Sequence, residues 1–331
     1  MRTKYPKFQA IEALVDAMHL KTDDITSVTE LRDSMRSFVA RIRYKNCTSD
    51  RQVILKRAFT GSIEFESDII RLFERNGIDV AKIIALYPEA GLLILEDLGD
   101  INLESMDSRE NRIQEAIDIL IQIHFAGIRC FDELRSIFRA HGRDRKFDLS
   151  GYNKQLAMIN LNRIQDLFRN KFPNSEKRKI LELLLQMLSF TAEKNPNCYQ
   201  ADIPSPLIIN DLKPHHFILH DNRFKIIDLE TLTLFGIPQI DLVHLLEHPA
   251  FQLSSEIKEK YINYYYDKIL SARMDFLKGR EDFKIGYVYY LLTYKLFISC
   301  VSRKKSPNLL NEFSGVPLID DILQIVKKHE A

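Results

Sequence analysis

The sequence has little excess charge, few cysteines and no long apolar run. Its 47 Lys and Arg residues balance 46 Asp and Glu residues, giving a net charge of +1, so overall charge favours no particular partner. The four cysteines are scattered without a C-x-x-C pair, which argues against zinc and disulfide frameworks and favours a reducing cytoplasm. No apolar run approaches about 18 residues, and the N-terminal residues MRTKYPKFQA lack a signal-peptide core. We therefore expect a cytoplasmic protein without an integral membrane segment.

The composition is ordinary for a folded chain of two lobes or domains. The 331 residues are 45% hydrophobic and 28% charged, which is enough to bury a sizeable core. Residues 129–180 are rich in Arg and Lys, but acidic residues are interleaved among them. The pattern predicts a solvated helical face and no nucleic-acid partner, because no basic and aromatic pattern of an RNA-binding module occurs.

Residues 207–242 carry the strongest pattern in the chain. The apolar run 207–209 ends just before Asp211, and a predicted hairpin beyond it ends at Asp228, 17 residues later. Glu230 follows two residues after Asp228. Carboxylates at strand ends suit two tasks of phosphoryl transfer, which are to deprotonate a hydroxyl nucleophile and to hold Mg²⁺ against phosphates.

This stretch resembles the catalytic core of small-molecule kinases of the aminoglycoside phosphotransferase and choline kinase type. Three motifs match in the right order, namely Asn-Asp-Leu-Lys-Pro at 210–214, Ile-Asp-Leu-Glu at 227–230 and Gly-Ile-Pro-Gln-Ile-Asp-Leu at 236–242. The resemblance implies an α+β, protein-kinase-like fold of two lobes. Residues 1–98 would form a small N-terminal lobe with an antiparallel sheet, and residues 99–331 a mainly helical C-terminal lobe.

The resemblance also implies roles for the acids and their neighbours. Asp211 would take the proton of the acceptor hydroxyl, and Lys213 would reach the transferring phosphoryl group. Asp228 would hold Mg²⁺ on the phosphates of ATP, with His216 or Glu230 completing the site. A small-molecule or glycoconjugate acceptor would be the other partner, while the oligomeric state has no sequence signal.

Two departures from the family pattern bear on these roles. The family His two residues before the catalytic Asp is Ile209 here, and the family Asn five residues after it is His216. A ring nitrogen suits Mg²⁺ less than an amide oxygen does, so Asp228 is the more secure ligand. The run His216-Phe-Ile-Leu is similar to lipopolysaccharide core heptose kinases. Asp241 resembles the buried aspartate that braces the catalytic loop.

The N-terminal lobe is expected to bind the nucleotide phosphates. Residues 37–58 predict a hairpin whose return strand places Lys56 where the family has its phosphate-binding basic residue; a solvated charge is the alternative. The helix predicted over 62–75 offers Glu66 as the partner of Lys56, with Glu64 in reserve; either acid could instead simply favour the helix N-terminus. The preceding loop contains no glycine, and its hydroxyl groups would come from Ser34 and Ser37.

The apolar run 92–95 ends abruptly in acids, and it resembles the interlobe hinge of these kinases. Backbone groups near Glu96, Asp97 and Leu98 would then hydrogen-bond the adenine edge. The simpler interpretation is a buried strand that ends in a turn, which does not exclude the hinge role.

Three functions are compatible with these patterns. The leading one is ATP- and Mg²⁺-dependent phosphorylation of a sugar or sugar-containing glycoconjugate, such as a lipopolysaccharide core or an amino sugar. A choline- or aminoglycoside-type kinase is the second, with an acceptor site that could use the acids Asp267, Asp275, Glu281 and Asp282. The third is a catalytically weak pseudokinase. The missing glycines, Ile209 and His216 favour it, whereas the retained Asp211, Lys213, Asp228 and Glu230 argue against it.

Overall fold

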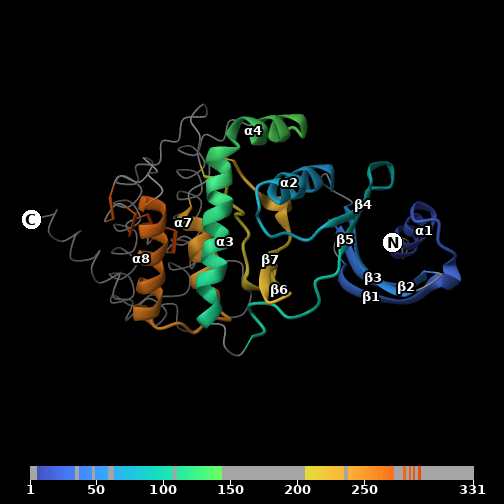
Figure 1. Cartoon of the computed structure of the whole chain (residues 1–331), viewed down its shortest axis with the longest axis horizontal. Coiled ribbons are helices and arrows are strands. Elements are labelled where there is room, and N and C mark those ends of the chain that lie inside the picture. The colour runs from blue at the N-terminus through green and yellow to red at the C-terminus, as the bar shows by residue number, and fades with distance from the viewer. Residues whose placement is uncertain are drawn as a thin grey trace, which may run out of the picture. The chain divides into compact units, whose positions relative to one another are not determined.

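A computed structural model of the chain is drawn in Figure 1. The chain folds into two compact units. The first comprises Met1–Ala126, Cys130–Asp144 and Pro214–Leu232, and the second Gly127–Arg129, Arg145–Lys213 and Thr233–Ala331. The structure describes residues 6–33, 37–46, 49–58, 63–106, 110–143, 206–234, 238–271, 279–280, 283–284, 286–287 and 290–291.

An antiparallel sheet of five strands, in the order β1-β2-β3-β5-β4, forms the centre of the first unit. Its strands are β1 (Ile25–Asp33), β2 (Ser37–Asn46), β3 (Ser49–Ala58), β4 (Ile83–Tyr87) and β5 (Leu92–Glu96). The hairpin predicted over 37–58 is confirmed as β2 and β3, paired from Ser37↔Ala58 to Asn46↔Ser49.

The two faces of this sheet have different surroundings, because side chains alternate along each strand. Phe38, Ala40 and Ile42 of β2 are fully buried in a core with Leu14 of helix α1 (Pro6–Ala17). This packing of α1 on β2 and β5 is visible in Figure 1. The residues between them, such as Val39, point to the other face, where the cavity described below lies.

Helix α2 (Ile63–Arg75) packs near β4 and β5 and contacts α4 (Phe131–Ala140). Its apolar stripe follows the predicted spacing, and it begins with two acids in the first turn. Gly77 ends it with φ of 70°, a left-handed conformation that glycine adopts without strain. Helix α3 (Glu110–Arg129) is the longest described helix.

A second, two-stranded sheet contains β6 (Phe217–His220) and β7 (Arg223–Ile226). The predicted turn between them is confirmed, since Asp221 and Asn222 have φ of 50° and 62°, as a tight two-residue hairpin requires. Short 3₁₀ turns precede and follow this hairpin, namely η3 (Pro214–His216) and η4 (Leu229–Thr231). The hairpin therefore carries His216 just before its first strand and Asp228 just after its second.

In the second unit, the described helices are α7 (Gln239–Leu246) and α8 (Ser255–Ser271). Tyr265 of α8 stacks on Phe283, with ring centroids 5.6 Å apart, so the tyrosines of this region are partly core residues. Among the described residues, no helix has both the length and the apolarity needed to cross a membrane.

Candidate active site

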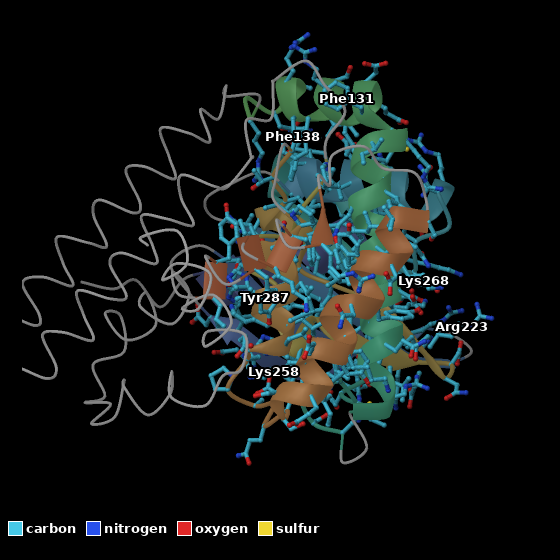
Figure 2. All side chains as sticks on the ribbon, turned by 90° about the vertical axis from the view of Figure 1, so that its left-hand side faces the viewer. Phe131, Phe138, Arg223, Lys258, Lys268 and Tyr287 are labelled. Atoms are coloured by element: carbon cyan, nitrogen blue, oxygen red, sulfur yellow. The ribbon has the colours of Figure 1, made fainter. Side chains whose placement is uncertain are left out.

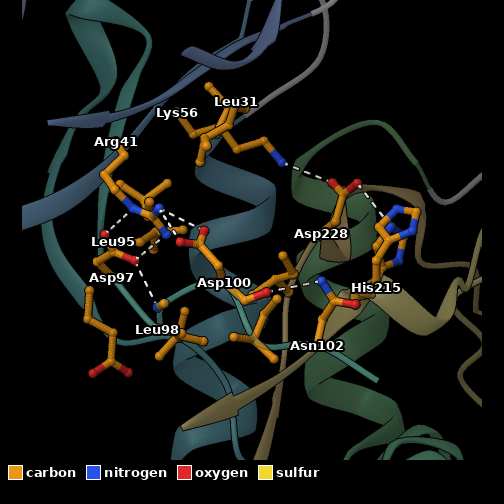
Figure 3. Close-up of a pocket in the computed structure, with 18 of the residues that line it drawn as sticks. Leu31, Arg41, Lys56, Leu95, Asp97, Leu98, Asp100, Asn102, His215 and Asp228 are labelled. Atoms are coloured by element: carbon orange, nitrogen blue, oxygen red, sulfur yellow. Dashed lines mark hydrogen bonds and ion pairs between the residues drawn. The ribbon is translucent and has the colours of Figure 1, made fainter. Parts of the chain in front are cut away.

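A cavity of about 450 Å³ opens on the face of the five-stranded sheet that does not contact α1. Three parts of the first unit line it, which are the strands β1 to β3, the segment after β5, and the ends of the β6–β7 hairpin (Figure 3). The charged side chains that line it either occupy alternate positions on a strand, as Arg41 and Lys56 do, or follow the end of a strand, as Asp97 and Asp228 do. The cavity thus gathers residues that are far apart in the chain.

Lys56 is the centre of an ionic cluster at this cavity. Its Nζ lies 2.7 Å from Glu66 Oε2, 3.2 Å from Asp228 Oδ1 and 3.2 Å from Glu230 Oε2. Lys56 and Glu66 are almost fully buried, at 7% and 4% side-chain exposure, so each charge needs the other. Three acids singled out in the sequence therefore converge on Lys56.

The cluster holds its members in defined charge states. Burial alone would lower the pKa of Lys56, but the surrounding charges of Glu66, Asp228 and Glu230 outweigh it and raise the pKa. Burial alone would raise the pKa of Asp228, but its attraction to Lys56 and His216 outweighs this and lowers the pKa. At neutral pH the site presents an ammonium and a carboxylate side by side.

Asp228 is presented by an unusual backbone conformation. Its φ is 62°, in the left-handed region that Asp tolerates better than most residues. His216 lies behind it, 4% exposed, with Nε2 3.7 Å from Asp228 Oδ2. Within the described residues, no group of three or more His, Cys, Asp or Glu side chains forms a ready-made metal site.

The donor set nevertheless fits one kind of metal site. Mg²⁺ at nucleotide sites is held by one or two carboxylates together with phosphate oxygens and waters. Asp228 and Glu230 supply two carboxylates, both 3.2 Å from the same ammonium group. The residues therefore suit a cation that arrives with the phosphates.

The segment after β5 is tied to the sheet by its side chains. Asp97 accepts bonds from Arg41 Nε at 2.5 Å and Nη2 at 3.0 Å, and also from Gln52. Arg41 also pairs with Asp100 at 2.7 Å (Figure 3). Burial would raise the pKa of Asp97, but Arg41 and the other donors outweigh it and lower the pKa. The Asp97 side chain thus ties this segment to β2 and β3.

Glu96 and Leu98 also line this cavity. The Glu96 backbone N–H donates to Lys82 O at 2.9 Å, and the Glu96 side chain accepts from Lys225 Nζ at 2.5 Å. The N–H of Glu96 is thus already used within the protein. Any base bound here would meet its carbonyl oxygen and the groups that follow it.

The two predicted serines are placed differently. Ser37 is 1% exposed at the start of β2 and is not among the residues that line the cavity, whereas Ser34 lies outside the described residues. Arg32 and Leu31, which precede them, do line the cavity. The hydroxyl role of the serines stays a prediction.

The loop with Asp211 belongs to the second unit. Lys213 Nζ lies 3.0 Å from Asp211 Oδ2, and both side chains are well exposed. The backbone turns sharply just before, since Asn210 has φ of 66°. Asp241, fully buried, accepts the Ile209 N–H at 2.7 Å and the Asn210 N–H at 2.9 Å. One buried carboxylate therefore holds the turn that presents Asp211.

The model of the phosphotransferase enzyme family, APH, matches residues 40–277 of this sequence. The chain belongs to this family. The match spans both the strand with Lys56 and the loop with Asp211. The recognition made from the motifs of residues 207–242 is thereby confirmed, and membership of this kinase-like family implies the use of ATP.

Solved structures agree on the fold of this phosphotransferase. Choline kinase LicA from Streptococcus pneumoniae is 18% identical, with 97% of this chain and 98% of that chain covered and a TM-score of 0.51. An ethanolamine kinase from Plasmodium vivax is 14% identical, covering 95% and 87%, with a TM-score of 0.53. A choline/ethanolamine kinase family protein from Mesorhizobium loti is 12% identical, covering 97% and 93%, with a TM-score of 0.53.

These likenesses confirm the predicted α+β, protein-kinase-like fold. A search of curated proteins finds no match.

Two site residues of the phosphotransferase were not singled out in its sequence. Arg41 clamps the segment after β5, and Arg143 donates to the backbone oxygen of Glu230 at 2.6 Å while lying over the Phe65 ring. Arg41 could have been found from the sequence, because it lies between apolar residues of a predicted strand and a charge there needs an acidic partner. Arg143 gave none, since its contact depends on how distant segments pack.

We expect Asp241→Asn to lower the free energy of unfolding of the phosphotransferase by about 1–3 kcal/mol. An amide has only one oxygen, so one of the two buried N–H groups at Ile209 and Asn210 would face an NH₂ group. Urea denaturation measures the change. Asp267→Asn, at a side chain 56% exposed, is the matched control and should change stability by less than about 0.5 kcal/mol. Equal stabilities for the two variants would contradict the bracing role.

His244, one helical turn after Asp241, predicts a pH dependence of stability. Burial lowers its pKa, and Lys213 and His248 act in the same direction, while Asp241 and Asp211 oppose them. The unfolded chain therefore takes up the proton first. Stability is complete above the unfolded pKa, near 6.5, and falls as pH drops below it.

The expected fall from this group is at most about 1.4 kcal/mol per pH unit. In His244→Gln, urea denaturation between about pH 7.5 and 5 should show a shallower decline than in the parent. An identical slope in both proteins would show that His244 does not contribute.

Proposed function

We propose that this phosphotransferase moves the γ-phosphate of Mg²⁺-ATP to a hydroxyl of a sugar or sugar-containing glycoconjugate, such as a lipopolysaccharide core or an amino sugar. The observation that carries the proposal is the cluster of Lys56 with Glu66, Asp228 and Glu230 at one cavity. A mere structural salt bridge would need one acid, whereas three acids around one buried lysine suit a site that receives phosphates and a cation.

In this proposal the nucleotide lies in the cavity of the first unit. The adenine edge meets backbone groups after β5, with Asp97 held in place by Arg41. Lys56 binds phosphate oxygens, and Glu66 keeps its ammonium group aimed into the cavity. Asp228 is the main ligand for the metal, and Glu230 or His216 completes the set. Mg²⁺, when bound, neutralises the charge that develops on the phosphate oxygens.

Asp211 supplies the remaining chemistry. Its carboxylate accepts a hydrogen bond from the acceptor hydroxyl, orients the oxygen and takes the proton as the phosphoryl group transfers. Lys213, 3.0 Å away, provides a positive charge for the transferring group and keeps the carboxylate in position. Asp241 acts on neither reactant and holds the turn that carries Asp211.

The described acids of the second unit favour a neutral acceptor over a cationic one, because they are already paired with other side chains. Asp267, an acid suggested for a cationic acceptor, pairs with Arg280 at 2.5 Å. The buried Glu247 accepts from Lys258 Nζ at 2.8 Å and from the Tyr287 hydroxyl at 3.1 Å, and Figure 2 labels both donors. These carboxylates already have partners, so they offer little to a quaternary ammonium. Asp275, Glu281 and Asp282 lie outside the described residues.

One observation favours a second candidate, a kinase for amino alcohols. The Arg280 guanidinium lies 4.8 Å from the centroid of the Tyr266 ring, so this ring face accepts a cation. A cationic acceptor could use the same face if Arg280 moved away. The acceptor class is therefore the quantity to measure.

A turnover screen tests the proposal. ADP release from Mg²⁺-ATP is followed with heptose-containing lipopolysaccharide core fragments, N-acetylated amino sugars, amino alcohols and aminoglycosides, with acceptor-free reactions as the blank. We expect saturable turnover with a sugar acceptor. Turnover confined to amino alcohols or aminoglycosides would contradict the sugar proposal and favour the second candidate. Tight ATP binding without turnover on any acceptor would favour a pseudokinase.

A further inference from the structure

Strand β1 contains one extra residue near its end. Its pairing with β2 runs through Glu30↔Ala40 and resumes at Arg32↔Val39, so Leu31 is the inserted residue of a β-bulge. Such a bulge shifts all later side chains of the strand by one position. Because strand side chains alternate, the shift moves Arg32 to the opposite face of the sheet.

The two faces differ greatly for an arginine. Without the bulge, Arg32 would lie opposite Phe38, on the face that packs against α1 and is fully buried there. With it, Arg32 lies opposite Val39, which itself pairs with Lys56. Arg32 and Lys56 thus occupy one row on the cavity face, two strands or roughly 10 Å apart at the backbone.

Their side chains meet at the same carboxylate. Lys56 Nζ lies 3.2 Å from Oδ1 of Asp228, a contact drawn in Figure 3, and Arg32 Nη1 lies 3.5 Å from Oδ2. The contact of Arg32 is long for a hydrogen bond, and its side chain is 44% exposed. An exposed, weakly held guanidinium can exchange this carboxylate for another anion at small cost.

The site has a need for such a cation. The segment between β1 and β2 has no glycine, so close approach of its backbone N–H groups to phosphates is not favoured. Lys56 already faces three carboxylates, and Arg41 is engaged by Asp97 and Asp100. Of the two arginines that line the described cavity, Arg32 has the longer contact with its carboxylate partner, 3.5 Å against 2.5 Å for Arg41.

We propose that Arg32 binds the phosphates of the nucleotide, leaving Asp228 as they arrive and forming with Lys56 a pair of cations around them. The planar guanidinium offers two parallel N–H groups that match phosphate oxygens. The exchange also frees the Oδ2 side of Asp228 for a phosphate-bound cation. This inference rests on the proposed nucleotide site. In it, Arg32 supplies phosphate contacts that the backbone of a glycine-rich loop would otherwise make.

The test compares nucleotide binding in Arg32→Gln, the parent and Arg71→Gln. Arg71, 54% exposed on α2, is the matched control, because it loses the same charge from the same unit away from the cavity. Dissociation constants for ATP and for adenosine are measured by calorimetry in excess Mg²⁺ without acceptor. For Arg32→Gln we expect ATP affinity to fall roughly tenfold to a hundredfold while adenosine affinity stays unchanged. Arg71→Gln should match the parent for both ligands.

Several outcomes would overturn the role of Arg32. They are an unchanged ATP affinity, an equal loss for ATP and adenosine, or the same loss in Arg71→Gln. Arg32→Lys, which keeps a charge on the strand, provides the second variant and should retain more ATP affinity than Arg32→Gln; no difference between them would also count against it. A parent protein that binds no ATP would instead refute the proposed function itself.

Discussion

Asp211→Asn is expected to lower kcat of the phosphotransferase by roughly 10²- to 10⁴-fold, the usual effect of losing a positioned base. The amide matches the carboxylate in shape but does not take a proton at neutral pH. Asp211 belongs to the exposed turn held by Asp241, and it is not among the residues that line the cavity. ATP affinity should therefore stay within about twofold of the parent.

The pair of measurements separates a base from a binding residue. Steady-state kinetics with the best acceptor give kcat, and calorimetry gives the dissociation constant for Mg²⁺-ATP. Asp221→Asn is the matched control, because Asp221 is 92% exposed in the β6–β7 turn, where Asn tolerates the positive φ. Activity of Asp211→Asn near that of the control would remove Asp211 from the reaction.

Asp228→Asn should have opposite effects on nucleotide binding with and without metal. In excess Mg²⁺ the affinity for ATP should fall tenfold or more, because a charged oxygen ligand is lost. With a chelator present, affinity for metal-free ATP should stay equal or rise, since a negative charge facing the phosphates is gone. Lys56 and Arg32, both now paired with this carboxylate, would become more available to phosphate.

Calorimetry with Mg²⁺ and with a chelator measures the direction of the change in ATP affinity under each condition. The kcat of the variant should fall by roughly 10²-fold or more. The depressed pKa of Asp228 means that the parent keeps its carboxylate throughout the neutral range, so pH 7 is a suitable condition. Parallel losses of affinity with and without Mg²⁺ would indicate a damaged fold. Unchanged affinity in both would move the metal site elsewhere.

The parts of the site that follow local patterns were predictable from the sequence. Lys56 falls on a strand with clear alternation, and Glu66 falls in the first turn of a helix with a regular apolar stripe. Asp211 follows a short apolar run and Asp228 follows β7, and both lie inside distinctive motifs. The structure brings Lys56, Glu66 and Asp228 into one cluster, although they are distant in the chain.

Other parts depend on pairing that no local pattern encodes. The bulge at Leu31 turns Arg32 toward the cavity, and its position follows from the register between two strands. The hinge role of Glu96 stays a prediction, and the hydrogen bond from its N–H to the Lys82 oxygen depends on how β4 meets β5. Ser37 looked available in the sequence and is buried, because the strand start is covered.

Direct detection of the transferred phosphate tests the central claim most sharply. Phosphorus NMR follows Mg²⁺-ATP with the best acceptor of the screen, using the parent and Asp211→Asn at equal concentration. The account predicts that the γ-phosphate signal disappears as a phosphate monoester of the acceptor grows in equal amount, and that Asp211→Asn forms almost none. Release of inorganic phosphate alone, or equal ester formation by both proteins, would contradict it.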